Sequence, residues 1–420
     1  MAFEKIKVLG AGSTLLDILA RVDDAFLSEH VAGEKGGMNL VNSETQHGLI
    51  DKLDQAGMSK AIGGSAFNTV SALTTLGFKT AFIGKLGKDE DGRYYTDSYR
   101  NLGGDVSSFK YTATAATGTC LCLVTPDSER TMRTDLGATA TINADDISDA
   151  DFEGITHVHL EGYLLFFIEV VKKILMLAKK HGCTVSFDFA SFEVVRLFRS
   201  ELHELLEKYV DIIFANEDEA KEFCKYEKFS PEAVAENLFH YCSVVVVKLG
   251  KEGSFIRENG VNHRIPPVLV NAVDTTGAGD LWQGGFLYGY LNGYGVEAAG
   301  RMGSVLGAEI VQVLGAQIPP ERWPAIREEF EKIKKQYAVN KDGLTHGKSK
   351  DCPQGKKSNG SRLQGEGYFS CCIRTQGTRH CGKGNARAYG CAQKIRQAET
   401  FEGNQDHGQS AHDDPDRRAD

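Results

Sequence analysis

Two apolar patterns alternate along roughly the first 336 residues of the chain. Short runs rich in Val, Ile and Phe are typical of buried strands, and the longer segments between them, in which apolar residues return every three or four positions, are typical of amphipathic helices. The predicted strands cover residues 6–10, 80–84, 157–162, 184–189, 211–215 and 244–249. The predicted helices cover residues 67–76, 167–180, 201–209, 217–223, 231–240, 279–291, 296–314 and 321–335.

Strands of this kind, alternating with helices, indicate βαβ units. Because the strands are almost continuously apolar, we expect a mostly parallel sheet whose two faces are both covered by helices. The sequence therefore predicts an α/β domain over residues 1–338, with ligands bound beyond the carboxyl ends of the strands.

Two stretches, at about residues 18–60 and 107–135, break the alternation. Within the second, residues 111–114 (YTAT) and 118–124 (GTCLCLV) favour antiparallel strands with one solvated face. Together the two stretches predict a small sheet that covers a site as a lid. Ordinary surface hairpins are the alternative interpretation.

The composition changes after residue 338. Residues 339–420 are rich in Gly, Gln, Ser, Lys and Arg, and their sparse apolar residues follow no period. Such a segment buries too little apolar surface to offset the entropy of ordering, so we predict a low-complexity, disordered tail. An out-of-frame extension and a zinc site are the alternatives, although no C-x₂-C pair joins its candidate ligands, Cys352, Cys371, Cys372, His380, Cys381 and Cys391.

Composition narrows the class of protein. The chain is 41% hydrophobic and 25% charged, as in globular proteins in solution, and its net charge of −9 argues against a nucleic-acid binder. No apolar run approaches the roughly 20 residues that cross a bilayer, and the N-terminus resembles no signal peptide. We expect a cytoplasmic protein with free thiols in apolar or helical segments, at Cys120, Cys122, Cys183, Cys224 and Cys242.

The most informative motif is DTTGAGD, residues 274–280, which follows the apolar segment 267–270 and opens a long apolar helix. A glycine turn at the start of a helix leaves backbone N–H groups free to bind an anion, and Asp280 places a carboxylate beside them. Phosphoryl transfer to a hydroxyl needs these parts: amides to hold charge on the transferred group and a carboxylate to take the proton. A tight turn with a helix cap is the alternative interpretation.

Weaker signals lie near the first strand and the first helix. No complete G-x-G-x-x-G follows the first strand, so a dinucleotide site is poorly supported, but the isolated Asp17 there suits the vicinal hydroxyls of a sugar. Gly63 and Gly64 allow a ligand to approach the backbone, and Asn68 in the next helical turn suits a hydroxyl. Each signal can also be a cap or a structural turn.

Two further signals follow later strands. Asn216 and Glu219 stand at a strand-to-helix junction, where they either cap the helix or organise Mg²⁺ and its waters. Lys248, Gly250 and Gly253 follow a buried valine strand, where they either shape a nucleotide pocket or form a plain turn.

In order and spacing, these motifs resemble the ribokinase/PfkB family of carbohydrate and nucleoside kinases. The resemblance spans about residues 5–336 and excludes the tail. It is carried by residues 63–68 (GGSAFN) with Gly77 and Gly87, 216–219 (NEDE), 248–253 (KLGKEG) and 274–280 (DTTGAGD). Residues 161–164, 214–217 and 318–323 resemble the bacterial adenosine kinase-like members.

The resemblance implies a ribokinase-like three-layer α/β/α domain with a mostly parallel central sheet and a small β-sheet lid. It implies a monomeric or homodimeric kinase that moves the γ-phosphate of ATP, with Mg²⁺ and optionally a monovalent cation, to a primary hydroxyl. Adenosine, converted to AMP in purine salvage, is the expected acceptor. A ribose-, fructose- or phosphosugar-type kinase and a non-catalytic nucleoside-binding regulator are the alternatives.

The resemblance also implies residue roles. Asp280 is the expected base, and the amides of Gly277, Ala278 and Gly279 are the expected anion hole. Sugar hydroxyls are expected at Asp17, Gly63, Gly64 and Asn68.

On the nucleotide side, ATP is expected at Asn216, Lys248, Gly250, Gly253 and Thr275. Indirect Mg²⁺ contacts are expected from Asn216 and Glu219, and Arg130 is expected near the phosphates. One departure concerns Leu281 and Trp282, which follow the catalytic Asp where the family usually has a small residue and Phe; we expect this bulk to affect efficiency rather than reaction type.

Overall fold

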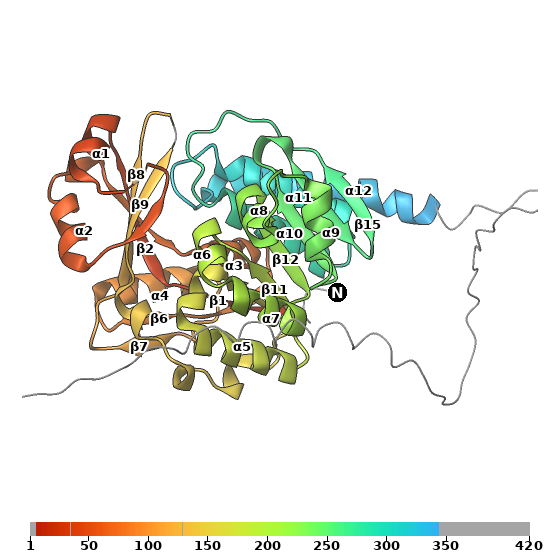
Figure 1. Ribbon diagram of the computed structural model, residues 1–420, viewed down its shortest axis with the longest axis horizontal. Helices are drawn as coiled ribbons and strands as arrows, with labels where there is room; N and C mark the ends of the chain where they lie inside the picture. The colour runs from red at the N-terminus through yellow and green to blue at the C-terminus, as the bar shows by residue number, and fades with distance from the viewer. Residues whose placement is uncertain (1–5, 34, 128, 344–420) are drawn as a thin grey trace, which may run out of the picture. The chain divides into compact units, whose positions relative to one another are not determined.

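The computed structural model describes residues 6–33, 35–127 and 129–343, and an eight-stranded sheet forms the centre of this part of the chain (Figure 1). The strand order is β15-β14-β13-β12-β11-β10-β1-β5; β14 and β15 form an antiparallel hairpin at one edge, and the other strands run parallel. Every predicted strand is confirmed to within a residue at each end, whereas the edge hairpin was missed. The bounds are β1 Lys7–Ala11, β5 Lys79–Ile83, β10 His157–Glu161, β11 Thr184–Asp188, β12 Ile212–Asn216, β13 Val244–Lys248, β14 Ser254–Glu258 and β15 Val261–Ile265.

The valine run of β13 shows how both faces of this sheet are buried. Val245 and Val247 belong to one core cluster and Val244 and Val246 to the other, because successive side chains of a strand point to opposite faces. Two layers of helices therefore cover the sheet, which confirms the predicted α/β fold. One layer contains α5 (Ile168–Lys180), α6 (Phe192–Leu197), α7 (Arg199–Tyr209), α8 (Glu217–Cys224) and α9 (Pro231–Leu238), and the other contains α3 (Ser65–Thr75), α10 (Ala278–Leu291), α11 (Val296–Ile310) and α12 (Trp323–Gly343).

Some helix boundaries differ from the prediction. Helix α11 ends at Ile310 rather than 314, because the chain turns to bring the Gly315 amide onto a carboxylate oxygen of Asp274 at 2.7 Å. Helix α12 continues to Gly343, and the rest of the predicted tail, 344–420, lies outside the described residues. No helix among those residues that the structure describes is long and apolar enough to span a bilayer.

Helix α4 (Glu90–Leu102) was missed because most of its residues are polar or charged. Its buried contacts come chiefly from Tyr95 and Tyr99, four positions apart, which pack on Phe67 of α3. Two aromatic rings one helical turn apart thus replace the aliphatic stripe that a periodicity search detects.

The predicted lid is a separate five-stranded sheet in the order β3-β9-β8-β2-β4, which we call the lid sheet. Figure 1 shows it in red and orange, with α1 (Asp24–His30) and α2 (Ser43–Ile50) packed along it. Leu27 of α1 and Leu49 of α2 contact Leu121 and Leu123 and so cover its outer face. Its strands are β2 Leu15–Arg21, β3 Met38–Leu40, β4 Ser59–Gly63, β8 Gly118–Val124 and β9 Arg130–Asp135.

Two lid predictions were wrong in detail. Strand β8 has no solvated face: its residues are almost all buried, because helices cover one side and the site lies on the other. Residues 107–117 are not part of the lid sheet, since β7 (Lys110–Thr112) pairs instead with β6 (Lys85–Gly87). Strand β8 does pair antiparallel, but its partner is β9 rather than residues 111–114, the neighbouring segment in the prediction.

Candidate active site

Two cavities meet at the N-terminus of α10. The first, which we call the lid-side cavity, has a volume of about 240 Å³ and lies between the lid sheet and residues such as Asn68, Asp188 and Asp280. The second, the loop-side cavity, has a volume of about 340 Å³ and lies between the turn after β13 and the segment 267–272. Ligands in the two cavities would meet at the residues that line both, Lys248, Thr275, Ala278 and Gly279.

Asp280 occupies the first turn of α10, and its side chain is held from two sides. Ser65 Oγ donates to Oδ1 at 2.9 Å, and Asn68 Nδ2 donates to Oδ2 at 2.9 Å. The Thr69 hydroxyl donates to the backbone carbonyl of Asp280 at 2.9 Å. Burial raises the pKa of Asp280, and the Asn68 hydrogen bond opposes that rise. A fixed carboxylate with a raised pKa is the arrangement that a general base needs.

The turn before Asp280 is built to expose amides. Gly277 has φ +70°, and the N–H groups of Gly277 and Gly279 donate to no acceptor among the described residues. The Ala278 amide donates to the Thr275 carbonyl at 3.2 Å, so this turn offers two free donors rather than the three that we predicted. With the positive end of the α10 dipole behind them, these amides suit an anion.

The Asp274 side chain holds the same turn in place through hydrogen bonds. It is fully buried, and its Oδ1 accepts hydrogen bonds from the Thr276 amide at 2.9 Å and the Thr276 hydroxyl at 2.6 Å. Its Oδ2 accepts the Gly315 amide at 2.7 Å. The first acid of the motif is therefore a structural anchor and the last is the candidate base.

Asp17 lies inside β2 rather than where the chain leaves the first strand, which corrects our placement. Its side chain is buried, next to Gly63 and opposite Cys120 in the neighbouring strand. Among the described residues no group donates a hydrogen bond to this carboxylate. Burial raises its pKa to about 7, although Arg130 lowers it, and the charges of Asp280 and Asp274 add to the rise. The Asp17 oxygens are thus free to accept a ligand's hydroxyls.

Asn68 faces both the candidate base and the cavity. Its Nδ2 donates to Asp280, while its Oδ1 is buried and accepts a hydrogen bond from no described residue. Gly64 precedes α3 with φ +115°, and a Cβ there would collide with the Ser13 carbonyl. A buried amide oxygen without a partner is costly, so a ligand hydroxyl donating to Asn68 Oδ1 would be favourable.

Asn216 and Glu219 cap α8, which confirms the structural interpretation of this pair. Asn216 Oδ1 accepts the Glu219 amide at 2.9 Å, and the Glu219 carboxylate accepts the Asn216 backbone amide at 2.7 Å and its Nδ2 at 2.8 Å. Both residues nevertheless line the lid-side cavity with Asp188. Burial raises the pKa of Glu219, and the nearby Asp188 charge raises it further.

Lys248 joins the two cavities. Its Nζ lies 3.1 Å from Asp188 Oδ1 and 3.0 Å from where a Cβ on Gly279 would stand. Gly250 and Gly253, with φ +51° and +90°, form the turn that follows and line the loop-side cavity. The structure therefore brings Lys248, Gly250, Gly253 and Thr275 together around the loop-side cavity, whereas Asn216 lines the lid-side cavity.

Trp282 does not crowd the candidate base. It packs against Phe214 of β12 and Phe286 of the same helix, with ring centroids 6.5 and 5.5 Å away, and it lines the loop-side cavity. Leu281 is buried in the same core. Of the two bulky residues after Asp280, Trp282 therefore forms part of the wall of the loop-side cavity, and Leu281 lies in the core.

Three site residues were missed from the sequence: Ser65, Glu161 and Asp188. Glu161 and Asp188 are the last residues of β10 and β11, so the rule that ligands bind beyond strand ends could have found them. Glu161 accepts the Ser13 amide at 2.8 Å and the Ala66 amide at 2.7 Å, and burial raises its pKa to about 7. Glu161 thereby links the N-terminal ends of β2 and α3.

Comparison with known proteins adds independent findings. Residues 36–323 match the pfkB family carbohydrate kinase model. Among solved structures, adenosine kinase from Sinorhizobium meliloti is 32% identical, with a TM-score of 0.72, over 77% of this chain and 99% of that chain.

Curated relatives differ in their acceptors. Adenosine kinase from Dictyostelium discoideum is 27% identical over 75% of this chain and 97% of its own length. A 5-dehydro-2-deoxygluconokinase from Clostridium beijerinckii is 29% identical over 66% of this chain and 86% of its own length. These identities leave nucleosides and sugars both open as acceptors.

Proposed function

The chain belongs to the pfkB family of carbohydrate kinases, and we propose that it phosphorylates a primary hydroxyl of a nucleoside, most simply the 5′-hydroxyl of adenosine. ATP is the phosphoryl donor that this family implies. The observation that carries the choice of acceptor is the composition of the lid-side cavity, which combines a hydroxyl-binding carboxylate with an apolar wall.

The apolar wall comes mainly from the lid. Leu40 and Phe166 line the cavity and remain 46% and 43% exposed, with Met38, Met132 and Leu136 beside them. A flat nucleobase would bury this surface while its ribose meets Asp17 and Asn68. A free sugar has hydroxyls on every side and would leave some of them against apolar side chains, unpaired.

The proton and the charge have separate acceptors in this arrangement. Asp280 takes the proton of the attacking hydroxyl, while the amides of Gly277 and Gly279 stabilise the charge on the transferring group. Lys248, between the two cavities, adds a positive charge on the phosphate side. Closure of the lid sheet over the acceptor would exclude water, which limits wasteful hydrolysis of ATP.

The donor set also fits Mg²⁺. Asp188 and Glu219 offer carboxylate oxygens, and Mg²⁺ typically keeps several waters and uses few direct protein ligands. When bound with ATP, Mg²⁺ neutralises charge on the phosphates. Asn216 would then position Glu219 through the helix cap.

A sugar kinase is the second candidate, and Arg130 is the residue that favours it. Its guanidinium lines the lid-side cavity near Asp17, where it would suit a carboxylate or phosphate on the acceptor. Arg130 lies in β9 of the lid sheet and lines the cavity that Gly277 and Gly279 also line, so its expected position near the ATP phosphates stays a prediction.

A substrate panel tests the proposal. ADP release and product mass would be measured with adenosine, other nucleosides, ribose, fructose, a sugar acid and a phosphosugar. We expect adenosine to give the highest kcat/KM and AMP as product. A higher kcat/KM for a sugar would overturn the choice of acceptor, and tight adenosine binding without product would favour a non-catalytic regulator.

A further inference from the structure

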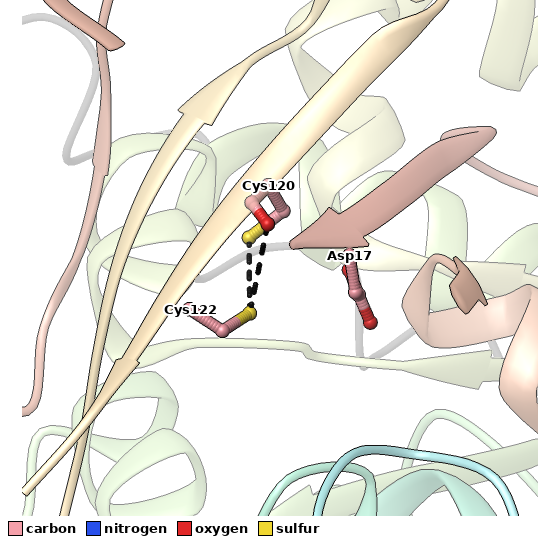
Figure 2. A group of neighbouring side chains, drawn as sticks. All are labelled: Asp17, Cys120 and Cys122. Atoms are coloured by element: carbon pink, nitrogen blue, oxygen red, sulfur yellow. Dashed lines mark hydrogen bonds between the residues drawn. The ribbon is translucent and has the colours of Figure 1, made fainter. Parts of the chain in front are cut away.

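Three potential metal ligands gather on the inner face of the lid sheet. Figure 2 shows Cys120 and Cys122 on one strand and Asp17 on the adjacent strand. Asp17 pairs with Cys120 in the register of β2 and β8, and Cys122 points to the same face because it lies two residues further along. One ligand atom of each residue lies within 4.8 Å of the others.

The spacing of the two sulfurs suits a tetrahedral ion. Cys120 Sγ and Cys122 Sγ are 3.6 Å apart. Two thiolates on one Zn²⁺ at a Zn–S distance of about 2.3 Å and tetrahedral angles would be about 3.8 Å apart. The thiols therefore need almost no movement, and the Asp17 carboxylate needs only a small approach to become a third ligand.

The surroundings leave room for an ion and partly offset the charge. All three residues line the lid-side cavity, so an ion would have an entry route and an open fourth position. Two thiolates and a carboxylate would carry three negative charges, and Arg130 interacts electrostatically with both Asp17 and Cys122. The ion and Arg130 together balance those charges.

We propose that Asp17, Cys120 and Cys122 form a binding site for a thiophilic divalent cation of the Zn²⁺ or Cd²⁺ type. Binding exchanges two thiol protons for the ion, M²⁺ plus two Cys–SH giving a bis-thiolate complex and two H⁺, with no change of oxidation state. The ion takes the Asp17 oxygens that a sugar would use. It therefore excludes the acceptor, a consequence that rests on the proposed function.

Cadmium titration tests the site directly. The full-length chain would carry serine at the five cysteines beyond residue 343, Cys352, Cys371, Cys372, Cys381 and Cys391. At about pH 8, with Asp17 ionised, we expect ultraviolet thiolate-to-cadmium absorbance that saturates at one equivalent, with two protons released. Cys120→Ser and Cys122→Ser should each weaken binding by more than the roughly 10–100-fold that loss of an outer-shell partner costs, and Asp17→Asn by about tenfold.

Two other thiols serve as matched controls. Cys183 donates to the Ile155 carbonyl and Cys242 to the Val244 carbonyl, both outside the cavity. Serine at either position should leave the cadmium affinity unchanged. Alanine variants of Cys120 and Cys122, checked by thermal unfolding, separate loss of a ligand from loss of the fold. Wild-type cadmium affinity in the folded Cys120→Ala/Cys122→Ala double variant would overturn the site.

Competition tests the consequence separately. Adenosine should raise the apparent Kd for Cd²⁺, and Zn²⁺ should inhibit phosphorylation in competition with the acceptor but not with ATP. If cadmium binds with the expected ligand dependence yet adenosine has no effect, exclusion of the acceptor is wrong while the metal site stands. Failure of the proposed function alone would appear as loss of this competition together with no AMP formed in the substrate panel.

Discussion

The two sheets differ in how firmly they hold the side chains that they contribute to the site. On the side of the large sheet, the working groups are already held: Asp280 accepts two side-chain hydrogen bonds, and Asp274 anchors the turn before it with three. On the side of the lid sheet, the Asp17 carboxylate accepts none from described residues, and Leu40 is 46% exposed. In the proposed function, Asp280 and its turn are therefore held before the substrate binds, whereas the Asp17 carboxylate gains hydrogen bonds only from the acceptor.

This difference predicts how substitutions divide between the two sides. Changes on the large-sheet side should lower kcat, because they remove interactions needed in the transition state. Changes on the lid side should raise KM for the acceptor, because they remove ground-state binding.

The largest effect is expected for Asp280→Asn. The amide has the same shape but cannot take the hydroxyl proton, so kcat should fall by about 10²–10⁴-fold with little change in either KM. Initial rates of ADP release over a range of acceptor and ATP concentrations would measure it. A kcat close to that of the unmodified protein would remove Asp280 from the role of base.

Gly277→Ala should come next. Gly277 has φ +70°, and an added Cβ would lie 2.8 Å from the Ala316 Cβ, so the turn that presents the amides must shift. Loss of one oxyanion-type donor typically lowers kcat by about 10²–10³-fold, and we expect a loss of that size.

Gly260 provides the matched control for this substitution. It has φ +79° in the turn between β14 and β15, and no atom of the part of the chain that the structure describes lies within 4 Å of an added Cβ. Gly260→Ala should cost about 1 kcal/mol of stability through the backbone alone and leave kcat unchanged. Equal loss of kcat in both variants would mean that strain, not the amides of the turn, explains the effect.

The same division explains what the sequence could predict. Residues 274–280 are contiguous, so the sequence alone could predict a turn with free amides beside a carboxylate. The valine run of β13 likewise predicted a strand buried on both faces. Asp17 acquires its neighbours only through pairing with Ala61 and Cys120, which come from distant parts of the chain. Long-range pairing of this kind leaves no local pattern, so the lid was predicted as a region but not strand by strand.

On the lid side, Asp17→Asn should weaken binding of the acceptor. A hydrogen bond to a charged group contributes about 1.5–3 kcal/mol, so KM for the acceptor should rise roughly 10–100-fold while KM for ATP stays unchanged. The exposed lid residue Asp51, at the end of α2, is the control: Asp51→Asn should alter neither constant. A fall in kcat without a change in acceptor KM would place Asp17 in the transfer step instead of recognition.

The smallest effect concerns pH, and it has opposite signs for binding and for stability. Burial raises the pKa of Asp17 from 3.8 to about 7. The ionised form accepts hydroxyl hydrogen bonds, so kcat/KM for the acceptor should fall about tenfold as pH drops from about 8 to 6. Glu161, with a pKa also raised to about 7, has both oxygens occupied by amides and should contribute little to acceptor binding.

The free energy of unfolding should fall as pH rises, opposite to acceptor binding, and over a wider pH range. Between pH 3.8 and about 7 the folded protein holds a proton on Asp17 that the unfolded chain has released, so the Asp17 contribution to the free energy of unfolding falls as pH rises. Thermal unfolding of Asp17→Asn should therefore decline less steeply with pH than that of the unmodified protein, and its kcat/KM profile should lose the same limb. If Asp17→Asn flattened neither profile, the carboxylate would already be ionised throughout this range, and the unpartnered, buried state that distinguishes the lid side from the large-sheet side would be wrong.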